Sequence, residues 1–189
     1  MPGYSERRFS VDEFDRLGEL GFLGGPEHYE LWEGRIVMSP PAGGRHGNSD
    51  GFVSAQLLFT LKALGLYRSR YIVVPNTGLQ LSDQTLVGPD IMVVETGEFP
   101  DRTYYQPETV KLCVEIADSS VEGDLGVKKG AYADADIAEY WVLDTRGKVL
   151  HTFREPDESD YRRHQQLRPG QSVSPLFEPR IEIAVGDLF

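Results

Sequence analysis

Cysteine is almost absent from the sequence. The single residue, Cys113, cannot form a disulfide within the chain, and it excludes a zinc site built from several thiolates. It lies in the apolar run Leu112-Cys113-Val114, where a buried core thiol is more common than a nucleophile. We therefore expect Cys113 to be a core residue.

Long hydrophobic runs are missing as well. No stretch of the chain approaches the roughly 20 consecutive apolar residues that cross a bilayer. The pair Arg7-Arg8 is not followed by the apolar segment of a secretory signal. We expect no association with a membrane and a location in the cytoplasm.

Positive charge is scarce. The chain has 19 lysines and arginines against 30 aspartates and glutamates, a formal net charge of −11. Tight binders of nucleic acid usually present a basic face, because phosphate contacts drive their affinity. The composition disfavours a tight stand-alone DNA binder. The arginines occur in scattered groups that are expected at the solvated surface: Arg7-Arg8, Arg68 and Arg70, and Arg162-Arg163 with Arg168.

Several signature motifs are missing. The sequence has neither GxGxxG nor GxxxxGK[ST], so no nucleotide-binding loop is indicated. Ser119-Ser120 lacks the context of a nucleophile elbow. The four histidines show no HExxH and no paired zinc spacing: His28, His46, His151 and His164.

The residues that are present fit one globular domain, 1–189. A chain of 189 residues with 40% hydrophobic residues can bury a sizeable core, whereas two domains would each be small and marginal. The 26% charged and 11% aromatic residues argue against disorder.

The first part of the chain predicts a helix and then a hairpin. Ser10 and Glu13 form a capping-box pattern ahead of a short helix that continues to about Leu20. Residues 29–38 are typical of a β-hairpin with its turn at Glu33-Gly34.

A loop at 39–44 and an amphipathic helix over 52–64 are expected next. The apolar residues predicted to form the wide buried face of this helix are Phe52, Ala55, Phe59 and Ala63, with Leu58 and Leu61.

The rest of the chain predicts strands around one further helix. The run 110–116 is the most continuously apolar, which indicates a central strand covered on both faces. This order of elements predicts an α/β or α+β fold in which helices and extra hairpins flank a mixed central sheet. The other expected elements are strands at 71–74, 79–81 and 90–94, a helix at 125–135, a hairpin of 139–144 with 148–153, and edge strands at 161–167 and 181–183 that close the sheet.

Two acidic residues stand out against this pattern. Glu115 interrupts the run 112–116, and an ionised carboxylate in a dry core costs several kcal/mol unless a cation or strong donors meet it. Asp90 opens the preceding apolar strand, and neighbouring strands could bring both carboxylates to one sheet edge. A divalent cation such as Mg²⁺ would relieve their repulsion, and it uses one or two carboxylates with waters and substrate phosphate.

The sequence resembles a known family, the Uma-type putative restriction endonucleases of the PD-(D/E)XK superfamily. The resemblance spans nearly the whole chain in order and spacing. The segments that carry it are Tyr29-Glu30-Leu31, Gly34, Met38-Ser39-Pro40, His46, Gly88-Pro89-Asp90, Val114-Glu115-Ile116-Ala117-Asp118-Ser119-Ser120, Asp124-Leu125-Gly126-Val127-Lys128, Tyr132, Ile137-Ala138-Glu139-Tyr140-Trp141-Val142-Leu143-Asp144 and Asp187-Leu188-Phe189.

This resemblance implies a restriction-endonuclease-like fold with metal ligands at Asp90 and Glu115. The superfamily's usual lysine, two residues after the second acid, would fall on Ala117. In this family the lysine is on the following helix, at Lys128. The resemblance also implies that Glu30 and His46 could add an acid and an imidazole to the site.

Each candidate also has an ordinary structural interpretation. Asp90 fits a turn-capping residue after a proline, and Lys128 fits a solvated helix lysine, with Lys129 equally eligible by composition. His46 fits a loop histidine and Glu30 a solvent-facing strand residue. Together, in family order, Asp90, Glu115 and Lys128 favour a site, while Glu30 and His46 stay open.

The sequence therefore predicts a nuclease that hydrolyses phosphodiester bonds of nucleic acid, with DNA as the first candidate, using Mg²⁺ or Mn²⁺ and a water nucleophile. We also expect a homodimer, because pairing two sites is a common way to cut two strands and two-fold dimers are the commonest assembly. The alternative is a catalytically silent nuclease-like module for binding or scaffolding, which the charge of −11 favours.

Overall fold

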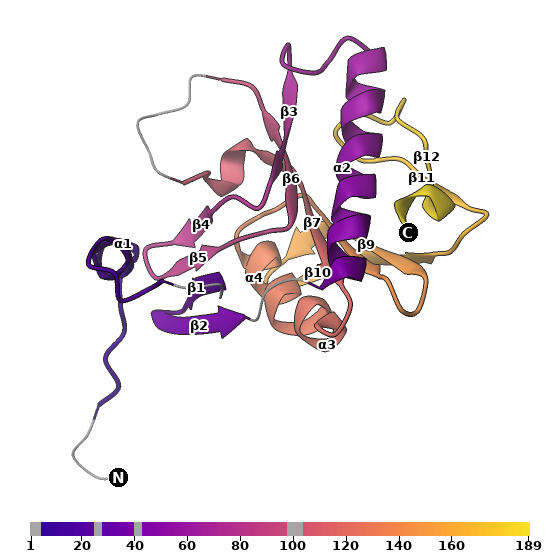
Figure 1. The fold of residues 1–189 in the computed structure, drawn as a ribbon. Helices are drawn as coiled ribbons and strands as arrows, with labels where there is room; N and C mark the ends of the chain where they lie inside the picture. The colour runs from indigo at the N-terminus through magenta and orange to yellow at the C-terminus, as the bar shows by residue number, and fades with distance from the viewer. Residues whose placement is uncertain (1–4, 25–27, 40–42, 98–103) are drawn as a thin grey trace.

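A computed structural model describes residues 5–24, 28–39, 43–97 and 104–189. Its centre is a six-stranded sheet in the order β10-β9-β8-β7-β6-β3 (Figure 1). β7 and β8 run parallel, and the other neighbouring pairs in this sheet are antiparallel. The strands are β3 (Tyr71–Pro75), β6 (Ile91–Glu95), β7 (Val110–Ala117), β8 (Glu139–Asp144), β9 (Val149–Asp157) and β10 (Asp160–Leu167).

β7 lies in the interior of this sheet and is covered on both faces. All of its residues except Lys111 are buried, which confirms the predicted central strand. Because side chains alternate along a strand, Leu112, Val114 and Ile116 belong to the core on one face and Cys113 to the core on the other. Cys113 is fully buried, as predicted.

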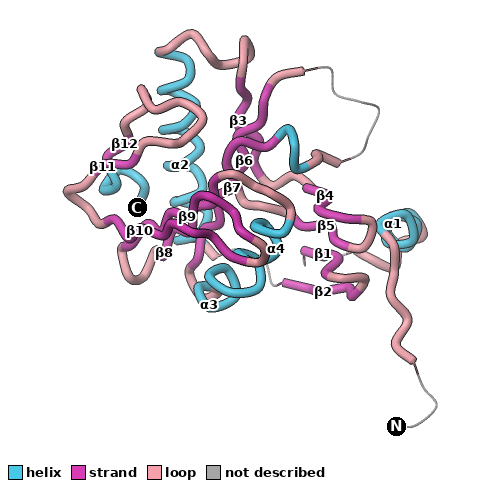
Figure 2. Tube along the Cα trace, turned by 180° about the vertical axis from the view of Figure 1, so that it is seen from behind, coloured by secondary structure: helices cyan, strands magenta, loops and turns pink. Residues whose placement is uncertain are grey.

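Helices cover the two faces of the sheet. α2 (Gly44–Ala63) packs on one face through Val53, Leu57 and Leu61, which recur every four residues. The opposite face is covered by the crossover between β7 and β8, which contributes Tyr132 and Ala133 to the second core. Figures 1 and 2 show α2 and α4 on opposite sides of the sheet. The crossover consists of α3 (Val121–Gly123), a π-helical segment (Asp124–Lys128) and α4 (Lys129–Asp134).

A smaller four-stranded sheet, in the order β2-β1-β5-β4, lies beside the main one. Its hairpin turns at Glu33 and Gly34, whose φ angles of 47° and 75° match a two-residue turn and confirm the prediction. β5 was not predicted from the sequence. The elements are α1 (Val11–Glu19), β1 (His28–Trp32), β2 (Arg35–Ser39), β4 (Leu79–Ser82) and β5 (Thr85–Val87), and a 3₁₀ turn at Pro107–Thr109 follows.

α2 differs from its prediction in two ways. It begins at Gly44 rather than near Phe52, so part of the predicted 39–44 loop and all of 45–51 are helical, while 40–42 lie outside the described residues. The predicted buried face is also only partly right, because Leu61 is buried whereas Phe52 and Phe59 are exposed. The helix carries apolar stripes on opposite sides, and periodicity does not specify which one meets the sheet.

The C-terminal part is partly as expected. β10 is an edge strand of the main sheet, as predicted for 161–167. The prediction that 181–183 closes that sheet is wrong, because Ile183 pairs with Val173 in a separate two-stranded sheet. Alternation predicts a strand but not its partner. The elements are β11 (Ser172–Val173), β12 (Ile183–Ala184) and a 3₁₀ turn at Val185–Leu188.

The predicted class is thus confirmed: a mixed central sheet with flanking helices and additional hairpins. No helix formed by the described residues is long and apolar enough to cross a membrane.

Candidate active site

Asp90 and Glu115 are brought together by the pairing of β6 with β7. The two strands are antiparallel, and Ile91 is paired with Val114. Asp90 and Glu115 lie one step beyond this pair, so the register places them side by side. The backbone N–H of Ile116 donates to Asp90 Oδ2 at 2.6 Å. Residues 25 positions apart in the sequence therefore meet, as the sequence predicted.

Both carboxylate oxygens of Glu115 have donors. The side chain is buried, with 2% of its residue surface exposed. Lys128 Nζ lies 2.9 Å from Oε2, and the Tyr132 hydroxyl donates to Oε1 at 2.7 Å. Burial raises the pKa of Glu115 well above its usual range, and Asp90 and Asp124 raise it further against the opposing charge of Lys128. The helix after β7 thus stabilises the carboxylate that the sequence marked as anomalous.

Lys128 and Lys129 point in different directions. Lys128 reaches Glu115 and also lies 3.6 Å from Asp124 Oδ1, whereas Lys129 Nζ lies 2.7 Å from Asp160 Oδ1. Burial lowers the pKa of Lys128, but the attraction of Glu115, Glu30 and Asp124 outweighs burial and raises this pKa above its usual value. The expected choice of Lys128 over Lys129 agrees with this geometry.

Asp124 is a buried site residue that the sequence prediction missed. The Ser120 hydroxyl donates to its Oδ2 at 2.5 Å, and its backbone carbonyl accepts from the Tyr140 hydroxyl at 3.1 Å. Burial raises the pKa of the Asp124 carboxyl. Its signal in the sequence was the i,i+4 spacing to Lys128, which places an acid and a base on one helix face.

His46 lies in the first turn of α2 and not in a loop. Its Nε2 is 3.2 Å from Asp90 Oδ2, and this hydrogen bond raises the pKa of the imidazole although burial opposes it. Asp50, one turn further along α2, accepts hydrogen bonds from the Asn76 amide at 3.3 Å and the Ser54 hydroxyl at 3.4 Å. The N-terminal end of α2 therefore supplies an imidazole to the acid pair.

Glu30 lies on the opposite wall, on β1. Its Oε1 accepts from the backbone N–H of Gly88 at 2.8 Å, and its Oε2 accepts from the Trp32 indole at 2.8 Å. Gly88 is two residues before Asp90. Glu30 thus links the smaller sheet, through this hydrogen bond to Gly88, to the segment that leads to Asp90.

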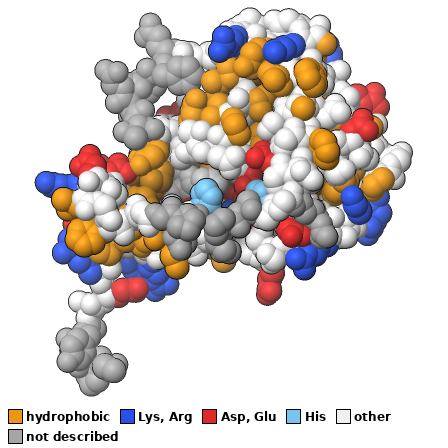
Figure 3. All heavy atoms as spheres, in the orientation of Figure 1, with side chains coloured by type: hydrophobic (Ala, Val, Ile, Leu, Met, Phe, Trp, Pro, Cys, Tyr) orange, Lys and Arg blue, Asp and Glu red, His pale blue; other side chains and the backbone are white. Residues whose placement is uncertain are grey.

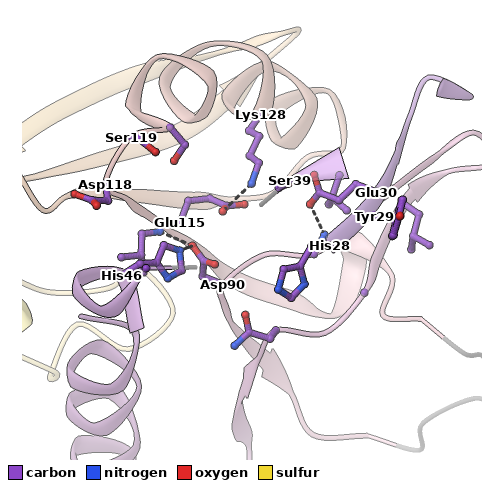
Figure 4. A pocket seen from close by; sticks show the side chains of 18 of the residues that line it. His28, Tyr29, Glu30, Ser39, His46, Asp90, Glu115, Asp118, Ser119 and Lys128 are labelled. Carbon is purple, nitrogen blue, oxygen red and sulfur yellow. Dashed lines mark hydrogen bonds and ion pairs between the residues drawn. The ribbon is translucent and has the colours of Figure 1, made fainter. Parts of the chain in front are cut away.

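The five predicted residues line one cavity of about 450 Å³ between the two sheets: Glu30, His46, Asp90, Glu115 and Lys128. Figure 4 shows Lys128 directed toward Glu115, with His46 beside Asp90, and Figure 3 shows histidine and acidic side chains in a hollow on this face. His28, also at the wall, was not assigned a role from the sequence. The structure brings the residues together, and their chemical roles stay predictions.

The donor set suits a hard divalent cation. Among the described residues, no group of three or more His, Cys, Asp or Glu side chains is arranged to hold a metal ion. The available pair is Asp90 with Glu115, and Mg²⁺ characteristically uses one or two carboxylates and completes its shell with waters and phosphate. The pair therefore fits Mg²⁺ or Mn²⁺ better than a closed zinc site.

Comparison with known proteins defines the class. The structure of a "putative nuclease belonging to DUF820" from Anabaena variabilis ATCC 29413 is similar, with a TM-score of 0.73 and 16% identity over 96% of this chain and 97% of that chain. This chain accordingly has a restriction-endonuclease-like fold. Residues 11–186 match the model of the Uma2 family, described as "Putative restriction endonuclease", and the chain belongs to that family. The search among curated proteins found no match.

Proposed function

We propose that this protein hydrolyses phosphodiester bonds in nucleic acid, with DNA as the first candidate, in the presence of Mg²⁺ or Mn²⁺ and with water as the nucleophile. The observation that carries the proposal is the convergence of Asp90 and Glu115 on one cavity with the Lys128 ammonium 2.9 Å from Glu115. Membership of the Uma2 family supports the nuclease class.

Asp90 and Glu115 would hold the cation. A carboxylate offers about four acceptor positions, so the donors already at these side chains leave room for further coordination. When bound, such an ion supplies a Lewis acid for the phosphate and lowers the pKa of a water molecule.

The other residues support the acids. Lys128 carries a positive charge at the wall of the cavity, where negative charge develops as a phosphodiester is attacked. It is the only lysine or arginine among the described residues that line the cavity. His46 can exchange a proton at Nε2 beside Asp90, and Glu30 positions the segment before Asp90.

A catalytically silent module is the second candidate, and two observations favour it. Lys128 and Tyr132 each donate to one oxygen of Glu115, so the protein itself supplies partners to this buried carboxylate. The charge of −11 also opposes the approach of a polyanion.

Calorimetric titration with Mn²⁺ tests the metal site independently of activity. Wild type should bind Mn²⁺ and Asp90→Asn should not, because the substitution removes one of two anionic ligands yet keeps an oxygen that accepts from Ile116. Asp118→Asn, also at the cavity wall, is the matched control and should bind as wild type does. Equal heats from wild type and Asp90→Asn would refute the metal site.

Cleavage of supercoiled plasmid, single-stranded DNA and RNA, with Mg²⁺ and Mn²⁺ each compared with EDTA, separates the two candidates. Metal-dependent cleavage that Asp90→Asn abolishes supports the nuclease. Metal binding without cleavage of any of these substrates favours the silent module.

A further inference from the structure

The outer face of α2 exposes apolar side chains that are not part of the hydrophobic core. Phe52 is 48% exposed and Phe59 is 64% exposed. With Ala55 and Ala63 they form a stripe, called here the outer stripe, at spacings of three and four residues. The residues buried against the sheet lie on the opposite side of the helix. Figure 3 shows apolar side chains gathered over α2.

The distribution of charge on α2 favours a second copy of this chain as the partner of the outer stripe. The segment 51–61 contains no charged residue, although the chain carries a net charge of −11. Two copies that approach through most other surfaces repel each other, whereas contact through this segment brings no carboxylates together. An anionic membrane is a poor occupant for the same reason, because Lys62 alone follows the segment and the chain as a whole is acidic.

The stripe is also complementary to itself. Phe52 and Phe59 lie on either side of Ala55, at distances of three and four residues. A two-fold axis through the helix near Ala55 would pair the helices antiparallel and place Phe52 of one copy against Phe59 of the other, twice. A small residue at the centre lets the two helices approach closely, and aromatic pairs contribute beyond the area that they bury.

We propose that the outer stripe of α2 is the contact surface of a two-fold homodimer. This surface does not depend on the nuclease proposal, because none of its four residues lines the cavity. The small sheet and the crossover helices remain outside the contact.

Light scattering coupled to gel filtration gives the first test. Wild type should show twice the chain mass of 21.2 kDa, and Phe59→Asp should show the monomer mass because it buries a charge in the contact. Phe22→Asp is the matched control: Phe22 is 72% exposed but lies after α1, so this variant should remain a dimer. Circular dichroism should show that both variants are folded, since both side chains are exposed.

Cross-linking identifies the face. Oxidation of Ala55→Cys should give a covalent dimer, because residues near a two-fold axis meet their own copies. Val127→Cys, 71% exposed on the crossover, should stay monomeric on a denaturing gel, and native Cys113 is buried and does not compete. A wild-type monomer at every concentration, or a dimer that Phe59→Asp leaves intact, would overturn the proposal.

Discussion

Lys128 and Lys129 offer a direct test of the site because the chain supplies its own control. They are adjacent lysines whose side chains are similarly buried, with 22% and 20% of their surface exposed. Both are ion-paired, but Lys128 meets the buried Glu115 and Lys129 meets Asp160, whose side chain is 65% exposed. The two substitutions therefore differ chiefly in the environment of the partner.

The partners set the expected magnitudes. Charges 2.9 Å apart attract by about 6 kcal/mol at an effective dielectric constant of about 20. Removing one member of a buried pair typically costs about 3–5 kcal/mol, because the other charge stays buried. A pair whose acid is exposed to solvent, such as Lys129 with Asp160, contributes about 0–1 kcal/mol.

We expect Lys128→Ala to lower the free energy of unfolding by about 3–5 kcal/mol and Lys129→Ala by less than about 1 kcal/mol. Urea denaturation followed by circular dichroism measures both. If Lys128→Ala does not fold, the same measurement is made on Lys128→Gln, which keeps a donor for Glu115. Equal losses from the two alanine variants would contradict the inference that Glu115 depends on Lys128.

The same pair tests catalysis. If plasmid DNA is cleaved in Mn²⁺, Lys128→Gln should reduce turnover by about 10²–10³-fold, as loss of one preorganised electrostatic group does. Lys129→Gln should leave turnover close to wild type. Unchanged turnover in folded Lys128→Gln would remove Lys128 from the proposed mechanism.

Two further predictions concern buried hydrogen bonds. Tyr132→Phe removes the donor to Glu115 Oε1 and should lower the free energy of unfolding by about 1–3 kcal/mol in urea; no change would show that this hydrogen bond is dispensable. His151 Nδ1 lies 3.1 Å from His164 Nε2, and burial lowers the pKa of both imidazoles. The unfolded chain therefore binds more protons, so these groups reduce stability as the pH falls through about 6.5. Wild type should lose more stability than His151→Gln between roughly pH 7.5 and 5.5, and parallel losses would refute this assignment.

The acid pair could be predicted because each acid leaves a local signal, and its lysine could be predicted from the family resemblance. Glu115 interrupts an apolar run, and Asp90 begins the strand beside it. The family resemblance indicated Lys128, whereas composition alone left Lys129 equally eligible. The contacts of both lysines agree with these expectations.

The features that were missed depend on contacts between distant segments. Gly44, Gly47 and Gly51 disfavour a helix, yet α2 begins there, where His46 meets Asp90 and Ser49 is buried. Tertiary contacts override local propensity in this turn. Neither the stripe of α2 that meets the sheet nor the partner of Ile183 is encoded in periodicity, because both depend on the arrangement of the whole fold.

The smaller sheet also has a consequence for synthesis of the chain. β1 pairs with β5 through Leu31 and Leu86, and the backbone N–H of Gly34 donates to the carbonyl of Gln84. Residues 28–39 are therefore synthesised before their neighbouring strand β5, at about 5–20 residues per second. During that interval the β1–β2 hairpin stands by itself, and an isolated hairpin is marginally stable at best. The wall of the cavity that carries Glu30 is thus completed only after β5 and the segment that leads to Asp90 have been synthesised.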